Sequence, residues 1–398
     1  MLRLYLLIAA AVVALVLLEA LSSSVGSPAA PPPGNCSPSP ALNFNASGYN
    51  EFAVEFYKRL ALSHLGENFA VSPFSVYKAF AVVYAGAGGE TREEMKRVFG
   101  FGEDPCEVAP AGRGMEEATS AWLQTGVTFT QQYLEKLACL CAEVHRVDFH
   151  GNFKAAVEEI NKWVEEKTRG LVRDLVPPNL PNQKEKVVAV LVSALYFEAG
   201  WWPRSFSRVG EGSFAGAARP VEYMALDLRS CGDPSLVGKI EDNITVVKLP
   251  LKNTEMAMYI VVPRDFKAYI ASLTYEKLRE DLSNLTAEVV YVKMPIFVAE
   301  FKGSIKDVLK ELGIRRAFDL SEADFSPMVG SRDVYLSDAF HGAYVKAYEK
   351  GIVAAAATAV EAVAICAKVG GAEVVVDRPF LFVLADDRAI YFIGHVVG

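Results

Sequence analysis

Residues 352–365 form a run of small and apolar residues with a single charge, Glu361. Alanine normally favours helices, but this run is rich in Val and Ile, follows Gly351 and leads into further glycines. Read with the two-residue period of a strand, its uncharged face contains Ile352, Ala354, Ala356, Thr358, Val360 and Ala362. Such a segment suits both an exposed loop and a strand buried between two others. We therefore expect a loop with two states.

Length and charge limit the classes of function. The chain has 398 residues, 52% of them hydrophobic, and can bury a large core. Its net charge of −8 and pI of about 5.4 lack the basic character of nucleic-acid binders, so no nucleic-acid partner is predicted. The six cysteines show no CxxC and no zinc spacing with histidine, so no metal site is predicted.

The N-terminal region differs from the rest of the chain. Residues 1–25 contain Arg3, fifteen uninterrupted apolar residues and a small-residue end, which predicts a secretory signal peptide. An uncleaved membrane anchor, with residues 4–21 as the tether, stays open as the alternative, although a spanning helix needs about 20 residues. Both predict a secreted or extracytoplasmic protein. Residues 26–43 are proline-rich and predict an extended linker.

Two further expectations depend on the surroundings of the protein. Export permits a disulfide, which would join Cys106 to Cys139 or to Cys141, while free thiols remain an equal alternative. Scarce glutamine with abundant Val, Ala and Glu is typical of a thermophilic source, here a prokaryote.

Periodicity and capping patterns predict the main elements, with Ser72 and Thr91 expected to cap the helices that follow them. Helices are expected at 50–63, 73–85, 91–98, 129–144, 153–168 and 304–312. Strands are expected at 68–72, 186–197, 244–250, 256–262, 287–295, 297–301 and 380–384. The segment 186–197 is apolar throughout, so it should lie in the centre of a sheet. Because strands and helices alternate without a βαβ rhythm, the fold class is α+β.

Six motifs in this order resemble those of the serpin family, over residues 44–398. They are N-x-x-x-S-P-x-S at 68–75, T-x-x-E…G-F at 91–102, N-x-W-V at 161–164, A-L-Y-F before Trp201, L-S-D-A-F-H…E-K-G at 336–351 (similar to the family's L-x-S-x-x-x-H…E-x-G) and the C-terminal signature at 377–394. The resemblance implies one large mixed sheet, smaller sheets, about eight to nine helices and an exposed reactive loop at about 349–376.

The resemblance also implies a function. A serine protease attacks the reactive loop and forms an acyl-enzyme. The loop then inserts as an extra strand of the large sheet and traps the protease, releasing the strain of a metastable native state. The chain is then a monomeric suicide-substrate inhibitor and not an enzyme.

Family spacing from the hinge places the scissile bond at Ile365–Cys366, which implies elastase-, chymotrypsin- or subtilisin-like proteases with an apolar primary pocket. Counting back from Pro379 gives Lys368 instead, which suits trypsin-like targets. The implied hinge comprises Glu349, Gly351, Ile352, Val353, Ala354, Ala355, Ala356 and Ala357. The implied shutter, under the sheet, comprises Ser72, Ser75, Ser193 and His341; the breach, where insertion begins, comprises Trp201 and Glu349.

Several positions depart from the family pattern. Ser193 replaces the usual shutter asparagine, and Trp202 competes with Trp201 for the breach position. Ile296 stands where a basic partner for Glu349 is often found, which puts that ion pair in doubt. Only a short segment follows residue 102, so the helix that binds heparin-type cofactors looks shortened or missing and no cofactor is predicted.

Ile352 and Val353 replace the hydroxyl residue and glutamate common in inhibitors, so insertion should be slowed but not forbidden. The alternative function is a non-inhibitory serpin with a carrier, chaperone or structural role. A proline or a charge on the inward loop face would favour it, and neither is present. An enzyme is disfavoured because neither G-x-S-x-G nor H-E-x-x-H occurs.

Overall fold

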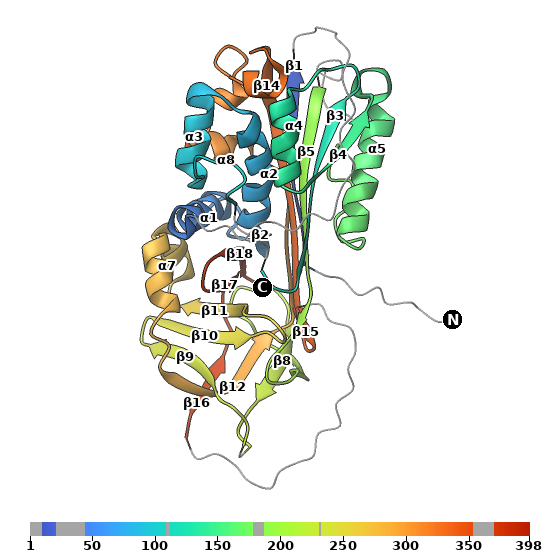
Figure 1. Ribbon diagram of the computed structural model, residues 1–398. Coiled ribbons are helices and arrows are strands. Elements are labelled where there is room, and N and C mark those ends of the chain that lie inside the picture. The colour runs from blue at the N-terminus through green and yellow to red at the C-terminus, as the bar shows by residue number, and fades with distance from the viewer. Residues whose placement is uncertain (1–9, 21–43, 109–111, 178–186, 231, 353–369) are drawn as a thin grey trace, which may run out of the picture.

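The computed structural model describes residues 10–20, 44–108, 112–177, 187–230, 232–352 and 370–398. A tall sheet runs through the upper part of the molecule, and a second sheet forms the lower part (Figure 1). In the described residues, nine α-helices surround these sheets. They are α1 (Ala46–Ala61), α2 (Pro73–Gly86), α3 (Gly89–Phe99), α4 (Gln131–Cys139), α5 (Phe149–Lys167), α6 (Phe266–Ala271), α7 (Tyr275–Leu282), α8 (Lys306–Leu312) and α9 (Ser326–Val329).

The tall sheet has the strand order β4-β3-β5-β1-β14-β15-β6, and β13 pairs with β14 beyond this path. Its strands are β1 (Ala10–Ala20), β3 (Met115–Gln124), β4 (Ala142–Val147), β5 (Val187–Phe197), β6 (Ala199–Gly200), β13 (Phe297–Ser304), β14 (Val334–Tyr348) and β15 (Gly351–Ile352). Because β3 and β4 are parallel while the other pairs are antiparallel, the sheet is mixed, as predicted.

The second sheet has the order β2-β18-β17-β11-β10-β9-β12-β8-β7, with β16 paired to β12. Its strands are β2 (Phe69–Val71), β7 (Ser207–Gly212), β8 (Val221–Asp227), β9 (Leu236–Glu241), β10 (Ile244–Pro250), β11 (Ala257–Pro263), β12 (Ala287–Pro295), β16 (Ala372–Val375), β17 (Phe380–Ala385) and β18 (Ile390–Val396). This α+β architecture confirms the predicted fold class.

Helices α2 and α5 pack on opposite faces of the tall sheet (Figure 1). Alternate residues of β5, such as Leu191 and Leu195, join the main core, on the side of α2. The residues between them, such as Val190 and Val192, join a separate cluster with α5. All eleven residues of β5 are buried, which confirms the prediction of a central strand.

Two element predictions were wrong. The segment 129–144 was expected to be one helix, but α4 ends at Cys139 and strand β4 begins at Ala142, after Cys141 adopts a φ of +55°. Thr91 was expected to cap a helix, but α3 begins two residues earlier, at Gly89. The Thr91 hydroxyl instead accepts a hydrogen bond from the Asp324 backbone N–H. In contrast, Ser72 caps α2 as predicted, accepting from the Ser75 N–H at 3.2 Å.

The disulfide Cys106–Cys139 joins the loop after α3 to the end of α4, one of the two predicted pairings. It closes a loop with a sequence separation of 33. Loop-closure entropy for such a length corresponds to roughly 3–4 kcal/mol. We expect the Cys106→Ala/Cys139→Ala variant to lose about that much unfolding free energy in non-reducing urea titrations. An unchanged midpoint would contradict this stabilising role.

His395 of β18 should make the unfolding free energy of the protein depend on pH. Its Nδ1 accepts from the Tyr57 hydroxyl at 2.9 Å, and its Nε2 donates to the His64 carbonyl at 3.0 Å. Burial lowers the pKa of His395 to about 4, below its ordinary 6.5. Because the unfolded chain takes up the proton first, stability should be full above pH 6.5 and fall by about 3 kcal/mol toward pH 4. Unfolding midpoints at several pH values test this, and a His395→Gln variant should lose that part of the slope.

Candidate functional site

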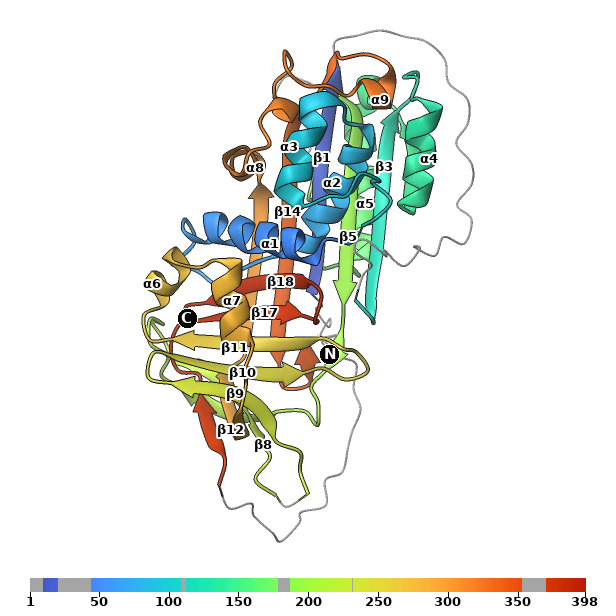
Figure 2. The same cartoon turned by 60° about the vertical axis from the view of Figure 1, so that its left-hand side comes forward.

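The tall sheet is built around a strand position between β5 and β14, called here the central slot. Strand β1 fills it, antiparallel to both neighbours, and Figure 2 shows β1 between them. Pairing extends from Ala10, opposite Phe197 of β5, to Ala20, opposite Val334 of β14. No direct pairing between β5 and β14 occurs in the described residues. The slot therefore holds one strand, and in this structure that strand comes from the N-terminal region.

The predicted hinge begins in the same strand position, beyond the Ala10 end of β1, at the lower end of the tall sheet in Figure 1. Gly351 and Ile352 form β15, which pairs with Ala347 and Tyr348 of β14 on one side and with β6 on the other. Ile352 is fully buried. A side chain at position 351 would meet the Ala199 carbonyl oxygen at 2.2 Å, so only glycine fits this close approach.

Two side chains, Trp201 and Arg208, contact the residues that lead into the hinge. Trp201 is buried and donates its indole N–H to the Tyr348 carbonyl at 2.7 Å, whereas Trp202 is 41% exposed. Of the two tryptophans, Trp201 is therefore the one that contacts the chain leading into the hinge. Arg208 of β7 donates to the Glu349 carboxylate at 2.5 Å. The ion pair that Ile296 had put in doubt is therefore present, with a different cation.

Electrostatics support the pairing of Glu349 with Arg208. Burial, the largest single effect, would raise the pKa of the Glu349 carboxyl. The hydrogen bond from Arg208, the backbone N–H of Glu349 itself and the charges of Arg208 and Lys346 together hold this pKa below its ordinary value. Arg208 also contacts Glu222 of β8 at 3.1 Å. Sequence reasoning missed Arg208 because it looked for a cation near residue 296. The available signal was the closeness of Arg208 in the sequence to Trp201, a predicted breach residue: Arg208 follows Phe206 by two residues in the same segment.

The four predicted shutter residues lie together, and all are buried. His341 Nε2 accepts from the Ser72 backbone N–H at 3.1 Å. The Ser75 hydroxyl donates to the Ser193 carbonyl at 3.2 Å and lies 3.5 Å from its hydroxyl. A serine at position 193 thus joins the network through its backbone as well as its side chain. In the central slot, Ala14 lies opposite both His341 and Ser193, so β1 crosses the shutter.

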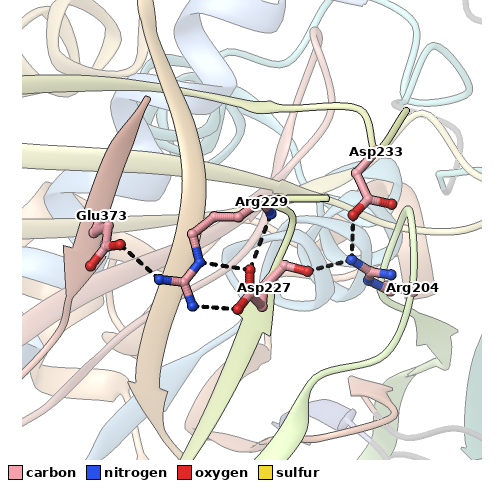
Figure 3. A network of polar contacts seen from close by, with 5 residues as sticks. All are labelled: Arg204, Asp227, Arg229, Asp233 and Glu373. Carbon is pink, nitrogen blue, oxygen red and sulfur yellow. Dashed lines mark hydrogen bonds and ion pairs between the residues drawn. The ribbon is translucent and has the colours of Figure 1, made fainter. Parts of the chain in front are cut away.

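Residues 353–369 lie outside the described residues, and the strand that follows them is β16. This strand lies in the lower sheet, parallel to β12. Figure 3 shows the polar network that holds its edge: Arg229 donates to Asp227 at 2.9 Å and to Glu373 of β16 at 3.0 Å. Arg204 binds the Asp227 carbonyl and the Asp233 carboxylate. Arg229 is exposed to solvent, which weakens its ion pairs, so strand pairing is the main anchor of β16.

The proposed scissile residues Ile365 and Cys366, the alternative Lys368 and the hinge residues 353–357 lie outside the described residues. Residues 100–108 and 112–114, where a helix was expected to be shortened or missing, form no helix. Among the described residues, no cluster of three potential metal ligands occurs, and no helix has the length and apolar character of a membrane span.

Comparisons with known proteins agree with this architecture. The family model described as "Serpin (serine protease inhibitor)" matches residues 47–398. An uncharacterized serpin-like protein of Pyrobaculum aerophilum is 59% identical over 359 residues, covering 90% of this chain and 95% of that protein. Serpin48 of the insect Tenebrio molitor has a TM-score of 0.72 at 26% identity, covering 88% of this chain and 97% of its own. Thyroxine-binding globulin in complex with thyroxine also has a TM-score of 0.72, at 22% identity, covering 89% of this chain and 98% of its own.

Proposed function

The chain belongs to the serpin family, and on that premise we propose that it inhibits serine proteases as a suicide substrate. The protease cleaves the reactive loop and becomes acylated. The loop then enters the central slot as an extra strand before the acyl-enzyme hydrolyses. The protein itself catalyses no reaction in this scheme.

One observation carries the proposal: the reactive loop begins as strand β15, already aligned with the central slot. Its register with Ala347 and Ala199 defines where each later loop residue would lie on insertion. If this register continued residue by residue, Thr358 would come to lie opposite His341 and Ser193, at the predicted shutter. Inward positions 354, 356 and 360 would meet buried apolar residues of β5 and β14. The uncharged loop face therefore matches the interior that would receive it.

The target class follows from the loop sequence. With the scissile bond at Ile365–Cys366, an apolar side chain would enter the primary pocket, so we propose elastase-, chymotrypsin- or subtilisin-like proteases. Cleavage at Lys368 would redirect the inhibitor to trypsin-like enzymes. A secreted or membrane-tethered location would place the inhibitor where such proteases act.

The test uses the chain without residues 1–41, which retains everything in the matched family model. This protein is incubated with elastase, chymotrypsin, subtilisin and trypsin, then examined by denaturing gel electrophoresis and intact-mass analysis. We expect a protease-linked band that resists SDS and a released C-terminal fragment beginning at Cys366. A fragment beginning at Val369 would keep the mechanism and move the bond to Lys368. Clean cleavage by all four proteases without a linked band would contradict inhibition.

A non-inhibitory role is the second candidate, and one observation favours it. Strand β1 already fills the central slot, and a filled sheet has no place for the loop. A protein that kept β1 permanently would be a protease substrate at most. Comparing chains with and without residues 1–41 distinguishes this role from inhibition.

A further inference from the structure

We propose that residues 10–20 act as a removable internal occupant of the central slot, which blocks the reactive loop until this segment is removed. This inference rests on the proposed inhibitory function, because blocking matters only if the loop must insert. The binding site is the pair of facing strand edges on β5 and β14. Its ligand class is an apolar, strand-forming peptide, which the chain supplies from its own N-terminus.

The register of β1 coincides with the register that the loop would adopt. Ile352 lies opposite Ala347 and Ala199, so continued pairing would bring Ala355 opposite Tyr344 of β14 and Tyr196 of β5. Ala11 of β1 lies opposite these same two tyrosines. Both edges of the slot thus give the same correspondence between β1 and the loop. The two segments compete for identical backbone hydrogen bonds.

The two competing sequences are also alike. In the shared register Ala10, Ala11 and Val16 fall where the loop has Ala354, Ala355 and Val360. Neither segment contains glycine or proline between these positions, so both can donate along the full ladder.

One position distinguishes them in favour of β1. Opposite Asp338 of β14, the N-terminal segment has Leu17, whereas the inserted loop would have Glu361. Like charges directly opposite each other in a sheet are destabilising. The N-terminal segment avoids this repulsion, so the uncleaved loop should not displace it unaided.

Cysteine pairs test the occupancy directly and without any protease. Cross-strand neighbours lie within disulfide distance and on the same face, whereas a shift of one residue reverses the face. Leu15 lies opposite Phe340. In the full chain, Leu15→Cys/Phe340→Cys should therefore form a cross-link, detected by peptide mass mapping under non-reducing conditions. The matched control, Leu15→Cys/Ala339→Cys, is off by one residue and should not.

Inhibition is then measured on three proteins: the full chain, the chain without residues 1–41, and full-length Val16→Pro. Proline removes a donor in mid-strand and should loosen β1; Ala29→Pro, in the proline-rich linker, is its control. We expect the full chain and Ala29→Pro to form at least tenfold less protease-linked complex than the truncated chain. Val16→Pro should recover most of the difference.

The outcomes separate this inference from the proposed function. Absence of the Leu15–Phe340 cross-link, or equal trapping by the full and truncated chains, would overturn the internal occupant. A cross-linked full chain that traps protease as well as the truncated chain does would also overturn it. If the cross-link forms but the truncated chain never traps protease, occupancy stands while inhibition and its blocking are refuted.

Discussion

Replacing Ala356 by glutamate in the chain without residues 1–41 should convert a protease trap into a simple substrate. In the proposed inserted loop, position 356 would lie opposite Ala343 and Leu195, which are both buried. An unpaired carboxylate there costs several kcal/mol. Loop insertion then becomes slower than hydrolysis of the acyl-enzyme. The amount of protease-linked complex on denaturing gels should fall at least about a hundredfold.

Ala355→Glu is the matched control, because it adds the same group one residue away on the opposite face. Its neighbours would be Tyr344 and Tyr196, and the Tyr196 hydroxyl already accepts a hydrogen bond from Arg169. Arg169, which also pairs with Glu116 and Glu198, would therefore be close to the added carboxylate. We expect this variant to trap protease within a few-fold of the parent. Equal behaviour of the two variants would contradict the assigned inward face.

The second large effect is a gain in thermal stability when the loop is cleaved. Roughly ten residues added as strand, at about 0.5–1.5 kcal/mol per hydrogen bond, stabilise the truncated protein by about 10 kcal/mol. With an unfolding entropy near 2 cal/mol/K per residue, Tm should rise by roughly 10–15 °C. Differential scanning calorimetry before and after limited proteolysis measures this.

The cleaved Ala356→Glu variant is the control for that gain, since its loop is cut but cannot insert fully. It should remain near the Tm of the uncleaved protein. A parent protein whose Tm falls on cleavage, as for an ordinary nicked loop, would contradict insertion.

Local sequence patterns predicted strand β5 and the start of helix α2 well. Strand β5 was predicted nearly to its ends because a continuous apolar run is the signature of a strand covered on both faces. Ser72 was predicted as a cap because the Ser-Pro pair fixes a helix start locally. The shutter residues were found through family motifs, since no local pattern links Ser75 to His341.

Long-range partners were harder to predict. Arg208 reaches Glu349 from 141 residues away, and nothing near either residue specifies the other. The helix expected at 129–144 failed because short apolar segments fit helix and strand alike, and the left-handed turn at Cys141 decides between them. Residues 10–20 were expected to be part of a signal or anchor, which stays untested. Their strand pairing was missed because an apolar run fits a membrane-embedded segment and a buried strand equally well.

The central claim is that the cleaved loop enters the central slot, and one cross-link tests it most directly. In the inserted loop, position 359 would lie opposite Phe340 of β14. The truncated Ala359→Cys/Phe340→Cys protein should form this disulfide after protease cleavage and not before. The off-register pair Ala359→Cys/Ala339→Cys should form none. A cleaved protein without the 359–340 cross-link, mapped by mass spectrometry, would contradict loop insertion.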